Sequence, residues 1–256
     1  MDIFGNTLRG MVLKIISSGS VGNCYLLDAG DEVLIVECGV PFKQIKRALC
    51  FDISKIVGAI VSHRHMDHAK SIKDIMSAGI PVLSSEDVFS SQGVSSDYFR
   101  AKVLVPERGY KIGNFKIIAF EVLHDCYCLG FHIHHPMSGN ILFVTDTYTI
   151  PYRFSNLNQL MIEINYSDEI IESNIINDRI NPVMRPRLLF SHMELETAKG
   201  ILRSLDLSNV VNIVLLHLSS ANSNEKQFVD EISEEFCKNT IAASKEIDIN
   251  FNLTPY

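Results

Sequence analysis

The stretch His63-Arg64-His65-Met66-Asp67-His68 decides how the rest of this sequence is interpreted. It follows the continuous apolar run Val57–Val61, which is typical of a strand buried on both faces, and it precedes a predicted helix over residues 69–78. In an extended turn every second side chain points the same way, so the first, third and fifth residues of the stretch share one direction. His68 then opens the helix, and Asp67 could cap it. Four side chains of ligand type therefore converge where a strand gives way to a helix.

The composition makes this stretch informative. Nine histidines are present in 256 residues, so three histidines and an aspartate at these four offsets should arise by chance on the order of once in a thousand chains. Neutral imidazole and carboxylate are ligands for zinc, and also for manganese or iron. The stretch therefore predicts a metal site in preference to a solvated, histidine-rich turn.

Three further ligand candidates stand at the ends of predicted strands. His124 follows a strand predicted over 115–123, Asp146 follows one over 141–145, and His217 follows one over 210–216. Functional sites collect at such strand ends in layered α/β folds. Seven candidates exceed the needs of one tetrahedral ion and fit two divalent ions that share a bridging carboxylate. We expect two such ions, with zinc favoured and manganese or iron compatible.

Other histidines and cysteines receive plainer interpretations. Residues 131–135 alternate apolar and polar, so His132 and His134 are expected on the solvent-facing side of a strand and, like His135, not as ligands. Cys126 and Cys128 are expected on one face of a strand as buried free thiols.

Bulk properties set the class of protein. Hydrophobic residues make up 46% of the chain, enough for a sizeable core, and no linker-like segment divides it. We expect one domain over residues 1–256, with residues 1–10 as a loose leader. No apolar run approaches the roughly 18 residues of a membrane span, and the N-terminus lacks signal-peptide features, so we expect a cytoplasmic protein. A net charge of −7 argues against broad nucleic-acid binding through a basic surface.

The remaining apolar patterns predict two packed sheets with helices outside. Strands are expected over 12–16, 24–28, 33–37, 81–84, 128–134 and 160–164, with a hairpin turn at 138–140. Helices are expected over 41–49, 167–176, 194–205 and 225–237.

The ligand pattern resembles the metallo-β-lactamase fold superfamily over nearly the whole chain. The segments 17–25, 163–166 and 217–222 resemble a bacterial branch of it that is related to exonucleases. The resemblance implies a four-layer αβ/βα sandwich, in which two mixed sheets carry helices on their outer faces and the metals lie at one edge. It assigns the first metal to His63, His65 and His124, the second to Asp67, His68 and His217, and the bridge to Asp146.

The same resemblance bears on the reaction. Lactamases of this fold usually carry cysteine or serine where this chain has Asp146, whereas phosphodiesterases, nucleases and glyoxalases carry the aspartate. His192 resembles an extra histidine of tRNA-processing and related nucleases that protonates the leaving oxygen; a structural role at a helix start is the alternative. Glu37 stands where the family has an aspartate that orients the metal site.

Substrate contacts are assigned to three more residues. Arg185 and Arg187 precede His192 and could meet phosphate oxygens in forked hydrogen bonds, with solvent-exposed side chains as the alternative. Asn222, in the segment 217–222, is a further candidate contact.

Our leading hypothesis is a dinuclear, metal-dependent phosphodiesterase or nuclease that acts on DNA or RNA. Asp67 would orient the attacking water, and His192 would donate a proton to the leaving oxygen. The alternative keeps the site and changes the substrate to a cyclic phosphodiester, thioester or lactone. A metal-binding or sensory protein with little catalysis is the third reading. No membrane partner is expected.

Overall fold

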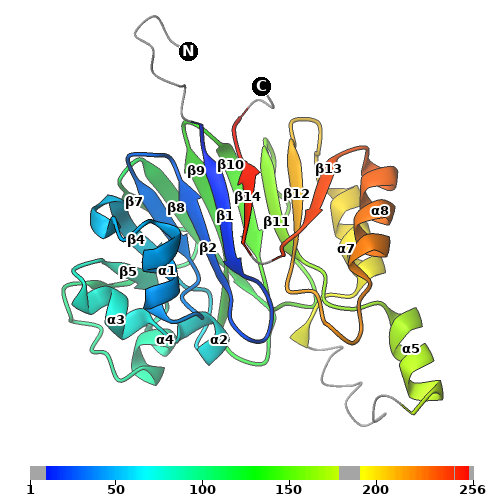
Figure 1. Ribbon diagram of the computed structural model, residues 1–256, viewed down its shortest axis with the longest axis horizontal. Coiled ribbons are helices and arrows are strands. Elements are labelled where there is room, and N and C mark those ends of the chain that lie inside the picture. The colour runs from blue at the N-terminus through cyan, green and yellow to red at the C-terminus, as the bar shows by residue number, and fades with distance from the viewer. Residues whose placement is uncertain (1–9, 179–190, 245, 254–256) are drawn as a thin grey trace, which may run out of the picture.

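Two seven-stranded mixed sheets form the centre of the computed structural model, which describes residues 10–178, 191–244 and 246–253 (Figure 1). The strands of the first sheet are β1 (Val12–Ser17), β2 (Cys24–Asp28), β3 (Val33–Val36), β4 (Ile56–Ile60), β5 (Val82–Ser84), β6 (Ala101–Val103) and β14 (Ile247–Asn250). They are ordered β14-β1-β2-β3-β4-β5-β6. Pairing is antiparallel from β14 to β3 and parallel from β3 to β6.

The second sheet has the matching plan. Its strands are β7 (Gly109–Ile112), β8 (Phe115–Val122), β9 (Cys128–His135), β10 (Gly139–Val144), β11 (Gln159–Glu163), β12 (Asn212–Leu216) and β13 (Asn239–Ala242). They are ordered β13-β12-β11-β10-β9-β8-β7. The strands from β10 to β13 run parallel, and β8 shares their direction because both β8 and β10 are antiparallel to β9.

Three apolar clusters define four layers. One cluster lies between the sheets and takes side chains from both, such as Leu34 of β3 and Phe143 of β10. A second joins the first sheet to α1 (Phe42–Ala48), α2 (Met66–Ala69), α3 (Ile72–Ser77) and α4 (Glu86–Ser91). A third joins the second sheet to the helices α7 (Leu195–Ser204) and α8 (Glu225–Phe236), while α5 (Asp168–Ile176) packs at its end. This arrangement confirms the predicted αβ/βα sandwich.

The predicted bounds of the helix over 69–78 are wrong. It begins at Met66 and is split into α2 and α3, with His65 as a cap residue that makes no side-chain cap bond. The loop after β3 explains the split, because the Cys38 backbone donates to His68 and accepts from Ser71. The approach is so close that a Cβ added at Gly39 would lie 1.6 Å from a backbone oxygen of α2. Tertiary contacts therefore set the local structure here.

The sequence patterns did not predict five short elements. These were α4, β6, β7, β13 and β14, which have three to six residues each. Four of them are strands of at most four residues, so they carry little periodic signal. The hairpin turn predicted at 138–140 instead occupies residues 136–138. Of the predicted leader, residues 1–9 lie outside the described residues. No helix among the described residues is long and apolar enough to cross a membrane.

A buried carboxylate ties the two sheets together at the edge bearing the β2–β3 turn. Glu32, in that turn, accepts hydrogen bonds from the Asn114 backbone (2.9 Å), the Asn114 amide (2.7 Å) and His135 (3.0 Å). His135 is thereby buried, whereas His132 and His134 are only half-buried. Burial alone would raise the pKa of Glu32, but the bonds from Asn114 and His135 hold that pKa below its usual range.

Glu32→Gln is expected to lower the free energy of unfolding by about 1.5–3 kcal/mol, the net worth of hydrogen bonds to a charged group. Because the pKa of Glu32 is lower in the folded than in the unfolded protein, the stabilisation is complete at pH values above the unfolded pKa of about 4.3. It is lost as pH falls through the lower folded pKa. Thermal unfolding of wild type and variant from pH 3 to 8 should show a difference in melting temperature that is constant above about pH 5 and narrows as pH falls below about 4. The exposed neighbour Asp31→Asn serves as control, and a difference that does not narrow at low pH would contradict this account.

Candidate metal centre

Polar side chains gather where the parallel strands of both sheets end. Asp146, Glu163 and His217 end or follow β10, β11 and β12, and His124 follows β8 in the same direction. Asp146 and His217 have positive φ, 48° and 52°, as does Glu37 after β3 at 65°. Such left-handed residues cost of order 1 kcal/mol or more and cluster at functional sites. At these three positions the backbone bends as it leaves the strand.

Asp146 lies at the centre of this group, buried between histidines on two sides. Its Oδ2 lies 3.8 Å from His63 Nε2, 3.5 Å from His68 Nε2 and 3.8 Å from His124 Nε2. Its Oδ1 lies 2.9 Å from His217 Nδ1. Burial alone would raise the pKa of Asp146, but His217 and His68 hold it well below its usual range. Asp146 is thus a charged carboxylate whose two oxygens both face histidines, Oδ2 on either side of it and Oδ1 toward His217.

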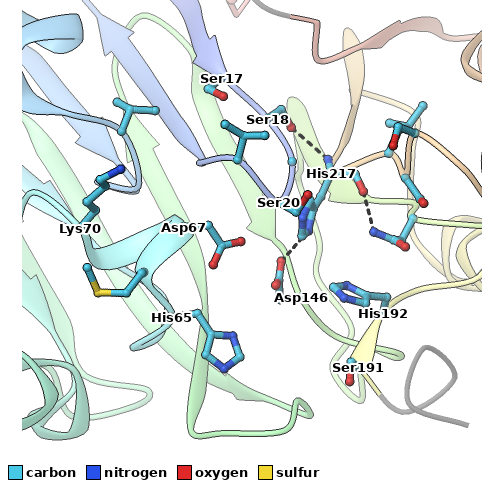
Figure 2. A pocket seen from close by; sticks show the side chains of 18 of the residues that line it. Ser17, Ser18, Ser20, His65, Asp67, Lys70, Asp146, Ser191, His192 and His217 are labelled. Atoms are coloured by element: carbon cyan, nitrogen blue, oxygen red, sulfur yellow. Dashed lines mark hydrogen bonds and ion pairs between the residues drawn. The ribbon is translucent and has the colours of Figure 1, made fainter. Parts of the chain in front are cut away.

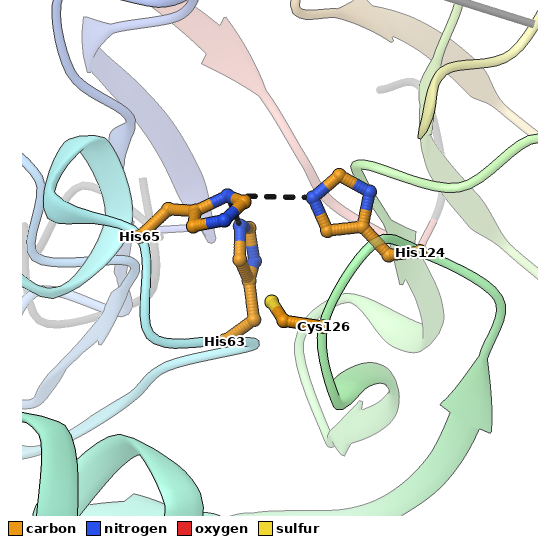
Figure 3. A group of neighbouring side chains, drawn as sticks. All are labelled: His63, His65, His124 and Cys126. Atoms are coloured by element: carbon orange, nitrogen blue, oxygen red, sulfur yellow. Dashed lines mark hydrogen bonds between the residues drawn. The ribbon is translucent and has the colours of Figure 1, made fainter. Parts of the chain in front are cut away.

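Three imidazoles face one another on the first side of Asp146 (Figure 3). His65 Nδ1 lies 3.0 Å from His63 Nε2 and 3.4 Å from His124 Nε2. The opposite ring nitrogens have their own partners. His124 Nδ1 donates to the Ser191 carbonyl at 3.0 Å, and His65 Nε2 faces the Asp125 carboxylate at 3.3 Å. Outer partners of this kind fix which nitrogen carries the proton in metal-binding histidines.

These partners make the group suited to a cation. A carbonyl and a carboxylate only accept, so in the neutral rings His124 Nε2 and His65 Nδ1 carry lone pairs that face each other across 3.4 Å, and the Asp125 carboxylate also lies 3.2 Å from His124 Nε2. Burial lowers the pKa of His124 and of His63, which favours neutral rings. Neutral imidazoles whose lone pairs converge repel one another unless a cation lies between them. The donor set therefore fits a divalent metal such as zinc.

A second group lies on the α2 side of Asp146. His68 Nε2 lies 3.6 Å from Asp67 Oδ2, and His68 Nδ1 lies 3.3 Å from Glu37 Oε2. Burial alone would lower the pKa of His68, but Asp146 and Glu37 outweigh it and raise this pKa to about 10. The Ser62 backbone donates to Glu37 Oε1 at 3.1 Å. Glu37 therefore contacts His68 at Nδ1, the ring nitrogen opposite the one that faces Asp146. The family resemblance implies an orienting role of this kind for Glu37.

Sequence reasoning gave no role to Glu163, which the structure places at the heart of the site. Its Oε1 accepts from His192 Nδ1 at 2.6 Å and lies 3.3 Å from His217 Nδ1, while its Oε2 accepts from the Thr147 backbone at 3.0 Å. Burial alone would lower the pKa of His192, but Glu163 raises it. The signal was available, since Glu163 ends a buried apolar strand between those that lead to Asp146 and His217.

His192 itself lies three residues before α7 and does not begin a helix. It lines the pocket beside Asp146 and His217, and its ring centre is 5.2 Å from that of His217 (Figure 2). With Nδ1 bound to Glu163, the Nε2 atom is left for a ligand in the pocket.

The expectation for Cys126 is wrong in one respect. Cys128 begins β9 and is buried, but Cys126 precedes the strand and is only half-buried. The loop after His124 carries Cys126 back toward the three imidazoles, and its sulfur and one nitrogen of each ring lie within 4.8 Å of one another (Figure 3). Burial and the neighbouring Asp125 raise the pKa of this thiol to about 11.

The cavity in front of these groups measures about 1060 Å³ and is open to solvent. His65, Asp67, His124, Asp146, His192 and His217 line it, while His63 and His68 lie beneath its floor. Asn222 does not line it; its side chain accepts from Asn174 at 3.3 Å, and its backbone carbonyl accepts from Ser167, the residue before α5. Arg185 and Arg187 lie outside the described residues.

Comparison with known proteins agrees with this geometry. The model of the metallo-beta-lactamase superfamily matches residues 18–147, about half of the chain, and the chain belongs to that superfamily. It is 24% identical over 231 residues to exodeoxyribonuclease WalJ of Streptococcus pneumoniae, with 84% of each chain covered. It is 22% identical over 249 residues to exodeoxyribonuclease YycJ of Bacillus anthracis, with 88% of this chain and 90% of the relative covered.

Solved structures show the same fold at lower identity. The metallo-beta-lactamase fold protein YhfI of Bacillus subtilis superposes with a TM-score of 0.70 at 18% identity, covering 93% of this chain and 99% of its own. The short form of human tRNase Z superposes with a TM-score of 0.63 at 12% identity, covering 94% and 99%.

Proposed function

We propose that this protein is a metal-dependent phosphodiesterase that cleaves nucleic acid. The observation that carries the proposal is the pairing of two features in one open cavity. One is a cluster of ligand-type side chains around Asp146, and the other is His192, held by Glu163 with a nitrogen left for a ligand. The names of the two exodeoxyribonucleases that this chain resembles support the same reaction.

Two divalent ions fit the ligand groups described above. We assign His63, His65 and His124 to the first, Asp67, His68 and His217 to the second, and Asp146 to both. Bound there, the ions would supply an activated water near neutral pH and would neutralise charge on the phosphoryl oxygens. The donor set accepts zinc and also manganese or iron, with zinc our first choice.

The protein's own side chains would then position the substrate and move protons. Asp67, whose carboxylate lines the cavity beside His68, is placed to accept a hydrogen bond from the attacking water. His192 faces the same space from the opposite wall, with its Nδ1 proton held by Glu163. Its Nε2 proton can therefore pass to the leaving oxygen.

The shape of the cavity favours a chain-like substrate over a small ester. Its volume of about 1060 Å³ lies at the upper end of the roughly 300–1,000 Å³ of pockets that enclose one small ligand, and it is open to solvent. Its rim includes Val21 and Met66, which are 92% and 57% exposed. A cyclic phosphodiester, thioester or lactone would leave most of this surface unused.

Metal removal gives the direct test. We expect elemental analysis to find close to two metals per chain, and we expect the protein to cleave a labelled oligonucleotide. Dialysis against a chelator should abolish cleavage, and one added divalent metal should restore it. Full metal content without cleavage of any oligonucleotide or chromogenic phosphodiester would contradict the proposal. It would indicate that the substrate belongs to another class of ester.

A further inference from the structure

One wall of the cavity carries a cation that the cluster around Asp146 does not use. Lys70 directly follows α2, three residues after Asp67, so the two side chains share one face of the helical turn. Lys70 is exposed and lines the cavity. Figure 2 shows it on the far side of Asp67 from His192 and Ser191. The cation and the proposed proton donor thus stand on opposite sides of the reacting centre.

Lys70 is free to bind an anion. Among the lining residues that the structure describes, it is the only lysine or arginine. No described carboxylate pairs with its amine, whereas the nearby Arg64 is held by Asp87 at 3.3 Å and does not line the cavity. Although the chain carries a net charge of −7, Lys70 places a positive charge at the wall of this cavity, where it suits an anionic ligand.

Exposed apolar side chains line the same cavity as Lys70. Val21, at the tip of the loop after β1, is 92% exposed, and Met66 is 57% exposed. Pro41, before α1, is also exposed, and all three line the cavity with Lys70. Single exposed apolar residues are ordinary, but here three of them line one cavity with a charge, and Met66 lies one helical turn before Lys70. A flat apolar group joined to an anion is the ligand that such a wall would recognise, and a nucleotide has both parts.

We propose that Lys70, Val21, Pro41 and Met66 form a subsite for the nucleotide next to the cleaved phosphodiester. Lys70 pairs with the phosphate of that nucleotide, and the three apolar side chains contact its base. The inference rests on the proposed function and extends it, because it makes the substrate a strand with at least a second phosphate beyond the one that reacts. Apolar contact with a base face tolerates any base, so the subsite selects strand length over sequence.

The test compares a substrate that lacks a second phosphodiester with one that has it. One is a dinucleotide with a single phosphodiester, and the other is a longer single-stranded oligonucleotide. In Lys70→Ala the ratio of kcat/KM for the long to the short substrate should fall roughly 10-fold, the worth of one charge-assisted phosphate contact. Lys70→Arg should largely keep the wild-type ratio. Lys73→Ala, which removes an exposed lysine on α3 outside the cavity, is the matched control.

Salt dependence supplies a second readout. Loss of one phosphate contact should reduce the slope of log KM against log salt for the long substrate by about 0.7. An unchanged substrate ratio and an unchanged slope in Lys70→Ala would overturn the subsite while leaving the phosphodiesterase intact. Failure of the wild type to cleave either substrate would instead overturn the proposed function, and the subsite with it.

Discussion

Replacing Asp146 by alanine is expected to lower the bound metal from two ions per chain to one or fewer. Asp146 is the carboxylate that we assign to both ions, with Oδ2 within 3.8 Å of three histidines and Oδ1 at 2.9 Å from His217. Its loss also leaves those imidazoles without the negative charge that they face. Cleavage of an oligonucleotide should fall by about 10³-fold or more, at or beyond the usual cost of removing one charge-stabilising group.

Metal content and activity should be measured on the same preparation of Asp146→Ala. Asp74→Ala removes an exposed carboxylate on α3 and should keep both metals and full activity. Circular dichroism separates loss of metal from loss of fold. If Asp146→Ala retained two metals and cleaved at the wild-type rate, our assignment of the bridging ligand would be wrong.

The strand ends could be read from the sequence because their signal is local. A buried parallel strand is a continuous apolar run, and the first polar residue after it stands at the functional edge of the sheet. This reasoning selected His63, His124, Asp146 and His217, which the structure brings together from β4, β8, β10 and β12. The packing of four layers followed from the same runs and from the family resemblance.

Contacts made by backbone or by residues distant in sequence were not readable in this way. The partner of His124 Nδ1 is the backbone carbonyl of Ser191, 67 residues away. Every residue has such a carbonyl, so the sequence does not indicate this contact. Sequence patterns gave no role to Lys70, because its relation to the cavity depends on where the helix splits. Glu163 was missed although it ends a buried apolar strand, because the sequence does not show that it bonds to His192.

Replacing His192 by alanine should slow cleavage of an oligonucleotide by roughly 10²–10⁴-fold, the usual contribution of a general acid. The leaving group of a natural strand is a sugar oxygen, which departs poorly without a proton. A nitrophenolate departs without one. The same variant should therefore lose far less activity on bis(p-nitrophenyl) phosphate, so its defect should depend on the leaving group.

Glu163→Gln should show the same dependence in weaker form. Glu163 does not face the leaving oxygen; it positions His192 through the 2.6 Å bond to Nδ1 and keeps its pKa raised, so the variant retains the acid but holds it less well. His134 is half-buried and does not line the cavity, so the cleavage rate of His134→Ala should show no dependence on the leaving group beyond that of the wild type. Equal losses on both substrates in His192→Ala would mean that His192 binds metal or supports the fold. Its place near Asp146, Glu163 and His217, all with ligand atoms within 4.8 Å, makes metal analysis of this variant the deciding measurement.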